Sequence, residues 1–300
     1  MNRRAFLQTA LAATAAAQPS NEWGTSVLDI HLHPRRDGGS ALDHLTGSGV
    51  TKAVLLTHLR ARQQAKKDIA AHPGRFAWFA ATDPTQPDAL NLLRKAVEEG
   101  AIGFGEMKNH VTADSKEMRR VYDLAAELRV PVLIHFQEVE HFAGEGDWNT
   151  GYRQFDQMIK AHRKTTFIGH ADFFWANISA DEPSKIAYPS AKVKPGGLTD
   201  RWLADHPNLY GDLSANSGFN ALTRDPDFTR GFLTRHRNKL MFGCDCSCKD
   251  GRGTGGSPIL PQLKGKCVAR STLQALKDHS SPEIFRNIVW DNGAKLLHLK

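Results

Sequence analysis

Five side chains with metal-binding chemistry stand at the ends of short apolar runs, far apart along this 300-residue chain. They are His31, His33, His135, His170 and Asp245. Alternate residues of a strand share one face, so the His31 and His33 imidazoles can chelate a single ion, and Asp29 is expected on the same face. Imidazole nitrogens and carboxylate oxygens are donors that suit zinc and similar divalent ions. The spacing therefore predicts a metal site built from several strand ends.

Eight apolar or β-branched runs supply the strands that must position these residues. The runs cover 27–33, 51–57, 76–80, 101–107, 131–136, 166–170, 208–213 and 240–245. Amphipathic segments lie between them, among them 86–99, 115–129, 152–162 and 227–237. Single strands alternating with helices imply a parallel sheet, and eight such units close as a TIM (β/α)8 barrel. A doubly wound sheet is the alternative, but no G-x-G-x-x-G motif follows the first run.

Three long segments follow the predicted strands 5, 6 and 8. They are 137–150, 171–199 and 246–269. Loops that follow barrel strands emerge at the face where active sites are built, and the five metal-binding side chains lie at the same ends. We expect these loops to wall the pocket, with Trp175 as a substrate contact in a wall or lid. Packing under the long loop is the alternative for Trp175.

The ordered set of histidines and aspartate resembles the amidohydrolase superfamily of metal-dependent barrel hydrolases, in its amidohydrolase-related branch. The resemblance covers residues 27–299, because 291–297 resemble the closing helix of that family. It implies metal-ligand roles for four residues, His31, His33, His135 and Asp245. It further implies that His170 binds a second metal or, in one-metal members, handles protons and the attacking water.

Glu106 and Lys108 fall on one face of the fourth run. The resemblance implies that this strand carries either a carboxylate ligand or a lysine that is carboxylated to bridge two ions. We favour Glu106 as a ligand or near-ligand and Lys108 as a substrate contact. Either a carboxylate ligand or a carboxylated lysine on this strand would support a site for two ions.

The expected chemistry is metal-assisted hydrolysis, in which an ion activates water and polarises a scissile carbonyl. Asp245 accepts the proton of the water and passes it to the leaving group, while His170 stabilises the oxyanion or orients the water. Asp212 and Ser214 share a face of the seventh run and are candidates to line the pocket, with capping of the next turn as the alternative for Asp212. His58, after the second run, is a further candidate substrate contact, with a structural role as the alternative.

The chain opens on Arg3 and Arg4, followed by an uncharged, Ala-rich stretch to residue 17. This layout is typical of a bacterial twin-arginine export signal, and the apolar part is too short to span a bilayer. We expect residues 1–17 to be that signal and 18–300 to form a single barrel domain. The export machinery would then deliver it to the periplasm or the medium, without stable membrane association. An Ala-rich amphipathic helix is the alternative for the opening segment.

Four cysteines, Cys244, Cys246, Cys248 and Cys267, lie at or after the eighth run. An even count in an exported protein favours disulfides, so we expect a bridge from Cys246 or Cys248 to Cys267 that pins the long loop beside the site. Cys-x-Cys-x-Cys with a distant fourth cysteine lacks zinc-ribbon spacing, so a structural zinc is the less favoured alternative. Cys244 lies inside the predicted strand and is expected to be buried.

The formal net charge is +7, and without residues 1–17 it is +5, from 37 basic and 32 acidic residues. This surplus is spread thinly, whereas nucleic-acid binders usually concentrate it, so we expect a small-molecule substrate and no nucleic acid. The sequence predicts an exported hydrolase of an amide, lactone or ester-like bond, with zinc favoured and Mn, Fe or Co as alternatives. The alternatives are a decarboxylase or hydratase of the same branch, a TatD-like nuclease, and a barrel that only binds metal.

Overall fold

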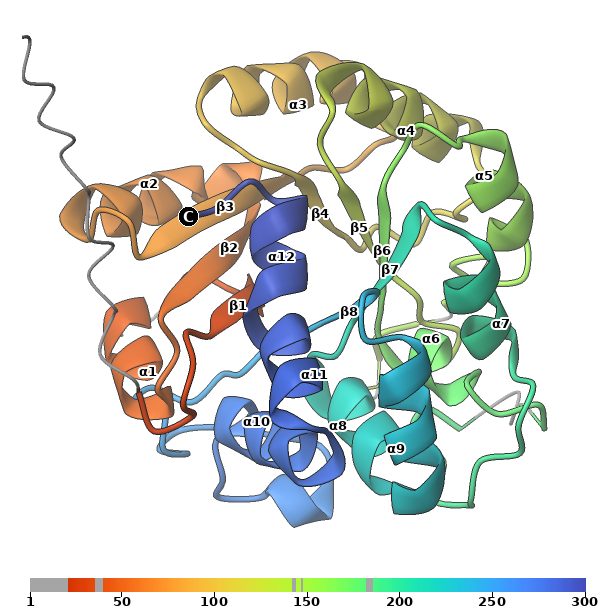
Figure 1. Cartoon of the computed structure of the whole chain (residues 1–300). Coiled ribbons are helices and arrows are strands. Elements are labelled where there is room, and N and C mark those ends of the chain that lie inside the picture. Colours follow the sequence, from red (N-terminus) through yellow and green to blue (C-terminus); the bar gives the residue numbers. More distant parts are fainter. Residues whose placement is uncertain (1–20, 36–39, 142–143, 147, 182–185) are drawn as a thin grey trace, which may run out of the picture.

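The computed structural model describes residues 21–35, 40–141, 144–146, 148–181 and 186–300. Its centre is an eight-stranded parallel sheet in which every strand pairs with the next one along the chain (Figure 1). The strands are β1 (Leu28–Leu32), β2 (Lys52–His58), β3 (Phe76–Ala81), β4 (Phe104–Met107), β5 (Val132–His135), β6 (Phe167–His170), β7 (Leu209–Asp212) and β8 (Leu240–Met241).

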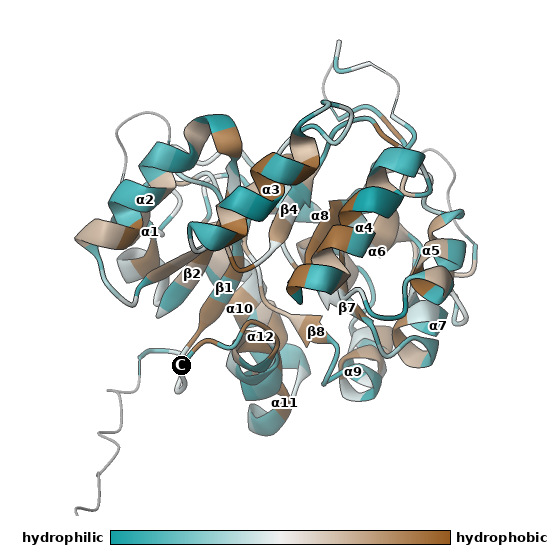
Figure 2. Cartoon of the chain, turned by 90° about the horizontal axis from the view of Figure 1, so that it is seen from above, coloured by the Kyte–Doolittle hydropathy of each residue, from teal (hydrophilic) through white to brown (hydrophobic). Residues whose placement is uncertain are grey.

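Helices cover the outside of this sheet over the described residues. They are α1 (Ala41–Ser48), α2 (Arg62–Ala71), α3 (Ala89–Glu98), α4 (Lys116–Leu128), α5 (Phe155–Ala161), α6 (Asp172–Ala176), α7 (Leu198–Asp205), α8 (Ala215–Thr223), α9 (Pro226–Arg235), α10 (Val268–His279), α11 (Pro282–Arg286) and α12 (Asn292–Leu296). The α3 and α4 ribbons alternate between hydrophilic and hydrophobic residues, as Figure 2 shows. In α4, the Ser115 hydroxyl accepts the Met118 N–H at the start, Arg129 ends the helix in a left-handed conformation, and Val121 and Tyr122 are buried.

Two backbone hydrogen bonds join the first strand to the segment after the last one. Ile30 N–H donates to the Phe242 carbonyl over 3.0 Å, and Asp245 N–H donates to the His31 carbonyl over 2.8 Å. Apolar side chains of six strands and of α12 form one cluster inside the ring. They are Leu28, Ile30, Val54, Leu56, Phe79, Leu133, Ile168, Met241, Ala294 and Leu297. The predicted TIM (β/α)8 barrel is confirmed, and its interior is a packed core.

The last strand is shorter than predicted. The sequence favours a strand over 240–245, whereas β8 covers Leu240–Met241 and Asp245 has a φ of 46°. A residue in the left-handed region cannot continue an extended strand, and Asp is among the few non-glycine residues that tolerate it. Asp245 therefore lies on the loop at the mouth of the barrel.

The predicted export signal, residues 1–17, lies outside the described residues. Among the residues that are described, no helix has the length and apolar character needed to cross a bilayer.

Candidate metal centre

The carboxyl ends of the barrel strands bring six predicted side chains together. They are His31, His33, Glu106, His135, His170 and Asp245. Three overlapping triads have their ligand atoms within 4.8 Å of one another: His31 with His170 and Asp245, His31 with His33 and Glu106, and Glu106 with His135 and His170. Shared members link all three triads, so the structure unites every residue that the sequence marks as a metal ligand.

His31 is fully buried, and its Nδ1 lies 2.6 Å from Asp212 Oδ2. Burial opposes the imidazolium charge, but the Asp212 carboxylate outweighs burial and raises the pKa of His31 to about 10. The opposite nitrogen, Nε2, has no hydrogen-bond partner within the described part of the chain. Because Asp212 anchors Nδ1, an ion that binds this imidazole would do so at Nε2 and would displace the proton from that nitrogen.

Gly243 lets this pair approach the segment after β8 that carries Asp245. A Cβ atom built at Gly243 would lie 2.3 Å from Asp212 Oδ1 and 2.8 Å from His31 Cβ. Neither atom belongs to a flexible surface chain that could move away, because both side chains are completely buried. Only glycine leaves room here for the His31 and Asp212 pair.

Glu106 reaches both halves of the cluster. Its Oε1 lies 2.5 Å from His135 Nδ1 and 3.4 Å from His170 Nε2, and its Oε2 lies 3.6 Å from His33 Nε2. Burial raises the pKa of a carboxyl group, but the surrounding imidazoles prevail and hold the pKa of Glu106 well below its usual range. The carboxylate is thus ionised and central, the position of a bridging ligand.

His170 is held in a defined tautomer by the residues after β7. Burial, followed by the nearby His31, lowers its pKa well below the ordinary value, so the ring is neutral. Ser214 Oγ lies 2.8 Å from His170 Nδ1 and 2.8 Å from Asp212 Oδ2. The hydroxyl donates to the carboxylate and accepts the Nδ1 proton, which leaves the Nε2 lone pair facing Glu106.

His135 is oriented by Gln137, which lies two residues further along. The Gln137 Oε1 is 2.9 Å from His135 Nε2, and the Gln137 amide nitrogen donates to Glu145 and to the Val139 carbonyl. A proton on Nε2 satisfies Gln137, so Nδ1 is the atom that faces Glu106 and the rest of the cluster.

Asp245 is the most accessible carboxylate of the cluster, with 32% of its side chain exposed. Its Oδ1 lies 3.4 Å from His33 Nε2 and 4.0 Å from His31 Nε2. The Asp245 carboxylate therefore faces both the histidines of β1 and the mouth of the barrel. In this position it can exchange protons with a molecule bound at the mouth.

Two cavities open beside this cluster at the barrel mouth. The first, of about 450 Å³, is lined by His33, Arg35, His58, Glu106 and Lys108 among others. The second, of about 150 Å³, is lined by His135, His141, His170, Tyr188, Asp245 and again Lys108, among others. Lys108 thus borders both cavities, and its Nζ lies 5.5 Å from the centre of the Trp148 ring. These volumes suit a small molecule placed next to the histidines.

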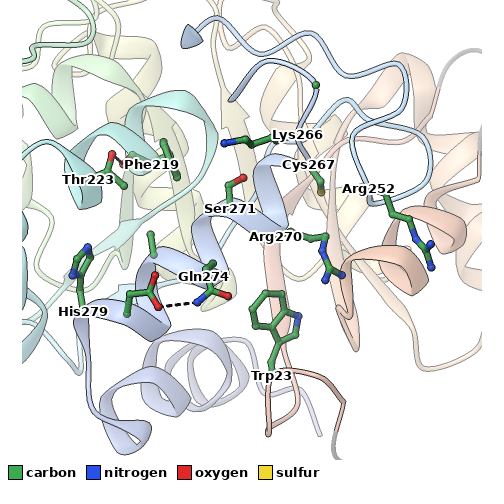
Figure 3. A pocket seen from close by; sticks show the side chains of 13 residues that line it. Trp23, Phe219, Thr223, Arg252, Lys266, Cys267, Arg270, Ser271, Gln274 and His279 are labelled. Atoms are coloured by element: carbon green, nitrogen blue, oxygen red, sulfur yellow. Dashed lines mark hydrogen bonds between the residues drawn. The ribbon is translucent and has the colours of Figure 1, made fainter. Parts of the chain in front are cut away.

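A more open hollow of about 540 Å³ lies on the outside of the barrel along α10 (Figure 3). Trp23, Arg252 and Arg270 are among its lining residues. None of the strand-end residues reaches it, so it is not a candidate active site.

Of the four residues predicted to contact the substrate, two line the cavities and two are buried away from them. Lys108 and His58 line the cavities, whereas Asp212 is fully buried and contacts His31 instead of open space. Trp175 lies in the core, 1% exposed, and its indole N–H donates to the Asp212 carbonyl over 2.8 Å. The short helix α6 turns this side chain inward, so it lines neither cavity.

The structure shows no sulfur–sulfur bond at the predicted disulfide to Cys267. All four cysteines are free and buried, and the sulfurs of Cys246 and Cys267 are 3.8 Å apart.

Gln137 and Arg35 belong to the surroundings of the site but were not among the residues predicted from the sequence. The only signal for Gln137 is its position two residues after His135, which places it on the same face, while no pattern marks Arg35.

No protein-family model matches the chain, and no curated protein matches it either. Solved structures share its fold. A probable 2-pyrone-4,6-dicarboxylic acid hydrolase from Acinetobacter baumannii superposes with a TM-score of 0.57 at 14% identity, over 91% of this chain and 100% of that one. The 5-carboxyvanillate decarboxylase from Sphingomonas paucimobilis gives a TM-score of 0.53 at 14% identity, with 87% and 82% covered.

A TatD homologue from Escherichia coli K12 gives a TM-score of 0.57 at 15% identity, over 91% of this chain and 98% of that one. These neighbours are members of the amidohydrolase superfamily, and at such identities the likeness establishes the shared fold. Because the same fold carries hydrolysis and decarboxylation, the reaction has to be argued from the side chains.

Proposed function

We propose that this chain, which shares its fold with the amidohydrolase superfamily, is a metal-dependent enzyme of that superfamily that hydrolyses a small molecule. The observation that carries the proposal is the convergence of six imidazole and carboxylate side chains within three linked triads. Buried groups of this kind, several of them held by partners on the side away from the centre, are arranged to bind ions and not to stabilise a core.

The donor set fits one or two divalent ions. Asp245 Oδ1 lies 4.0 Å from His31 Nε2 and 3.4 Å from His33 Nε2, so these three residues can supply one set of donors. Glu106 with His135 and His170 supplies the other. Nitrogen and carboxylate donors favour zinc, while Mn, Fe and Co accept the same ligands. When bound by these residues, a divalent ion would lower the pKa of a water molecule toward neutrality and would polarise a carbonyl group.

Two side chains of the protein, Asp245 and His170, handle the protons and the water. Asp245 faces the barrel mouth and accepts the proton of the attacking water, which it then delivers to the leaving group. His170 has its protonated Nδ1 engaged by Ser214, so its Nε2 lone pair is available to bind an ion or to accept a hydrogen bond that orients the attacking water.

Lys108 gives the site a preference for an anionic substrate. Its ammonium borders both cavities, and Arg35 lines the larger one. A cation beside the reacting carbonyl binds a carboxylate of the substrate and holds it against the ions. We therefore propose a small carboxylated lactone, amide or ester as the substrate class, with His58 as a further contact at the outer end of the larger cavity.

Decarboxylation is the second candidate, and the position of Lys108 favours it specifically. The same ammonium that orients a spectator carboxylate can hold the carboxylate that leaves as carbon dioxide, and one structural neighbour is a decarboxylase. The two reactions differ in their product, so release of carbon dioxide from aromatic carboxylates distinguishes them.

The test combines metal content with turnover. The protein is purified without chelator beside His31→Ala/His33→Ala, and metals per chain are counted by elemental mass spectrometry. A control, His72→Ala/His279→Ala, removes two imidazoles from the ends of outer helices. We expect the first variant to hold fewer ions than the parent, and the control to match the parent.

Both variants and the parent are then assayed on a panel of carboxylated lactones, amides and esters, with carbon dioxide measured in parallel. Hydrolysis by the parent and by the control, but not by the His31 and His33 variant, supports the proposal. Equal metal content in all three proteins, or turnover that survives loss of the ions, overturns it.

We further propose that residues 1–17 direct export through the twin-arginine machinery to the periplasm or the medium. The Arg3 and Arg4 pair, followed by an uncharged Ala-rich stretch, supports this. A reporter fused after residue 25 should be exported, and Arg3→Lys/Arg4→Lys should retain it in the cytoplasm. Retention of the unaltered fusion contradicts the proposal.

A further inference from the structure

A second group of metal-binding side chains lies outside the barrel, between α1 and the long segment after β8. It consists of His44, Cys246, Cys248 and Cys267, which we call the cysteine cluster. All four side chains are buried, with exposed fractions of 4% or less, and their ligand atoms lie within 4.8 Å of one another. The members come from α1, from the loop and from the residue before α10, so the cluster ties three segments together.

The spacing within the cluster is that of a tetrahedron around one ion. Zinc–sulfur bonds of about 2.3 Å and zinc–nitrogen bonds of about 2.05 Å give tetrahedral edges of about 3.8 Å between sulfurs and about 3.5 Å between sulfur and nitrogen. The Cys246 and Cys267 sulfurs are 3.8 Å apart, Cys248 Sγ lies 3.5 Å from His44 Nδ1, and Cys246 and Cys248 are closer, at 3.3 Å. We propose that the cysteine cluster binds a structural zinc ion.

Disulfide pairing accounts for these residues less well. Any single bridge uses two of the three clustered sulfurs and leaves the third as a buried thiol beside His44. Four ligands of the type Cys3His instead satisfy all four side chains at once, and three thiolates with one imidazole select zinc over the harder divalent ions. The site has no open position, which is typical of structural zinc and not of catalytic zinc.

The loop is built around the Cys248 sulfur. Backbone N–H groups of Gly251 and Gly253 lie near this sulfur, as they would near a metal-bound thiolate. Gly251 and Gly253 have φ values of 66° and 118°, and Cβ atoms at these positions would lie 2.3 Å from the His44 carbonyl oxygen and 2.5 Å from the Gly265 carbonyl oxygen. The loop can wrap the sulfur this closely only with glycine at both points.

His44 can adopt the tautomer that ligation requires. Its Nδ1 lies 3.1 Å from the Cys248 carbonyl oxygen as well as 3.5 Å from the Cys248 sulfur, and its Nε2 lies 3.6 Å from Cys244 Sγ. With the proton on Nε2, directed at the Cys244 sulfur, the Nδ1 lone pair would bind the ion in place of the contact with the Cys248 carbonyl oxygen.

Positive charge offsets the excess negative charge of such a site. Three thiolates, a neutral imidazole and Zn²⁺ sum to one negative charge, and Arg270 lies close enough to Cys267 to interact with it electrostatically. Figure 3 shows Cys267, Arg252 and Arg270 along one edge of the outer hollow. A guanidinium group that is also paired with Glu22 thus lies near the single negative charge that the loaded site would carry.

The cysteine cluster also positions residues of the barrel mouth. Arg35, which lines the larger cavity, donates to the Cys246 carbonyl over 2.8 Å. Cys244, next to the cluster, donates its N–H to Asp29 Oδ1, and the same oxygen accepts the His31 N–H. A zinc ion here would fix the loop that carries Asp245 relative to β1 without taking part in the reaction.

The test separates the two metal sites by their ligands. Zinc per chain is counted for the parent, for His31→Ala/His33→Ala and for Cys248→Ser, with Ser247→Ala as the control because it changes the exposed residue between Cys246 and Cys248 and removes no sulfur. We expect the His31 and His33 variant and the control each to keep one tightly held zinc that Cys248→Ser lacks. After cobalt exchange, the His31 and His33 variant should show thiolate-to-cobalt charge-transfer absorption.

The folded parent gives a second measurement that does not depend on how the variants fold. Titration of its thiols with an organomercurial should release one zinc as the clustered cysteines react, and the His31 and His33 variant should release the same amount. Absence of zinc release, absence of the cobalt-thiolate band, or fewer than four free thiols in denaturant without reductant overturns the proposal. The last result would identify a disulfide instead.

Discussion

His31 Nδ1 lies 2.6 Å from Asp212 Oδ2, and both side chains are completely buried at the top of the barrel. Asp212 also accepts a hydrogen bond from Ser214, which in turn accepts the Nδ1 proton of His170. One carboxylate therefore orients two imidazoles at once, one from β1 and one from β6. It fixes which nitrogen each ring presents to the metal centre.

Asp212→Asn should weaken metal binding while leaving all six proposed ligands in place. The amide cannot hold His31 in the required tautomer as strongly, and loss of such a supporting carboxylate typically costs about 10–100-fold in metal affinity. Competition with a chelator of known affinity measures this. Asp200→Asn is the matched control, because it removes a carboxylate that contacts His236 at 2.5 Å outside the barrel, and it should leave metal affinity unchanged. Equal affinities in all three proteins would contradict the role of Asp212.

Asp245→Asn should lower kcat much more strongly than it lowers the number of metal ions per chain. The side chain is partly exposed at the barrel mouth and lies 3.4 Å from His33, where it can take a proton from water and return it. Loss of a general base typically costs about 10²–10⁴-fold in kcat. The measurement is kcat together with metals per chain, and Asp227→Asn on the exposed face of α9 serves as the control. Unchanged turnover with the ions still bound would exclude Asp245 as the base.

The surroundings of Asp200 predict how the stability of the fold changes at acid pH. Burial raises the pKa of this carboxyl, but hydrogen bonds from His236 and Arg235 outweigh burial and bring the pKa below its ordinary value. The unfolded chain therefore binds a proton at higher pH than the folded chain, so the stabilisation is present above a pH of about 4 and is lost as the pH falls further.

Asp200→Asn should accordingly lower the free energy of unfolding at neutral pH, by about 1–3 kcal/mol, and the gap from the parent should close at low pH. Urea unfolding of both proteins at a series of pH values measures this. A gap that stays constant from neutral pH to well below pH 4 would show that the carboxylate charge does not stabilise the fold.

The fold and the clustering of the candidate ligands were predictable because each depends on short stretches of sequence. Strands buried on both faces are continuous apolar runs, and each of the eight predicted runs overlaps a strand of the structure. The carboxyl ends of parallel strands meet at one face of a barrel. Polar residues at the ends of those runs, such as His135 and His170, could therefore be placed together before any contact was known.

Contacts between distant segments were not predictable in this way. Strict alternation places Asp29 beside His31, but the pairing of β1 with β2 shifts between Asp29 and Leu32, and the Asp29 carboxylate instead accepts N–H groups of His31 and Cys244. His44 meets the cysteines across some 200 residues of chain, so local Cys spacing gave no sign of it. Whether Trp175 lines the pocket or packs in the core depended on the short helix α6, which turns the side chain inward.

Lys108→Met should reduce the preference for carboxylated ligands. The Lys108 ammonium borders both cavities and lies over the Trp148 ring, which leaves it facing the space next to Glu106 and Asp245. A charge-assisted hydrogen bond to a carboxylate contributes about 1.5–3 kcal/mol, which corresponds to about 10–100-fold in affinity.

Citrate is a suitable probe, because it is a small polycarboxylate whose binding can be measured without knowledge of the substrate. Calorimetry on the metal-loaded parent, on Lys108→Met and on Lys116→Met should show weaker citrate binding for the Lys108 variant alone, since the Lys116 side chain is 89% exposed and borders neither cavity. A neutral analogue should bind the parent and Lys108→Met equally. If citrate binds all three proteins alike, Lys108 does not recognise the substrate anion, and the choice of a carboxylated substrate fails with it.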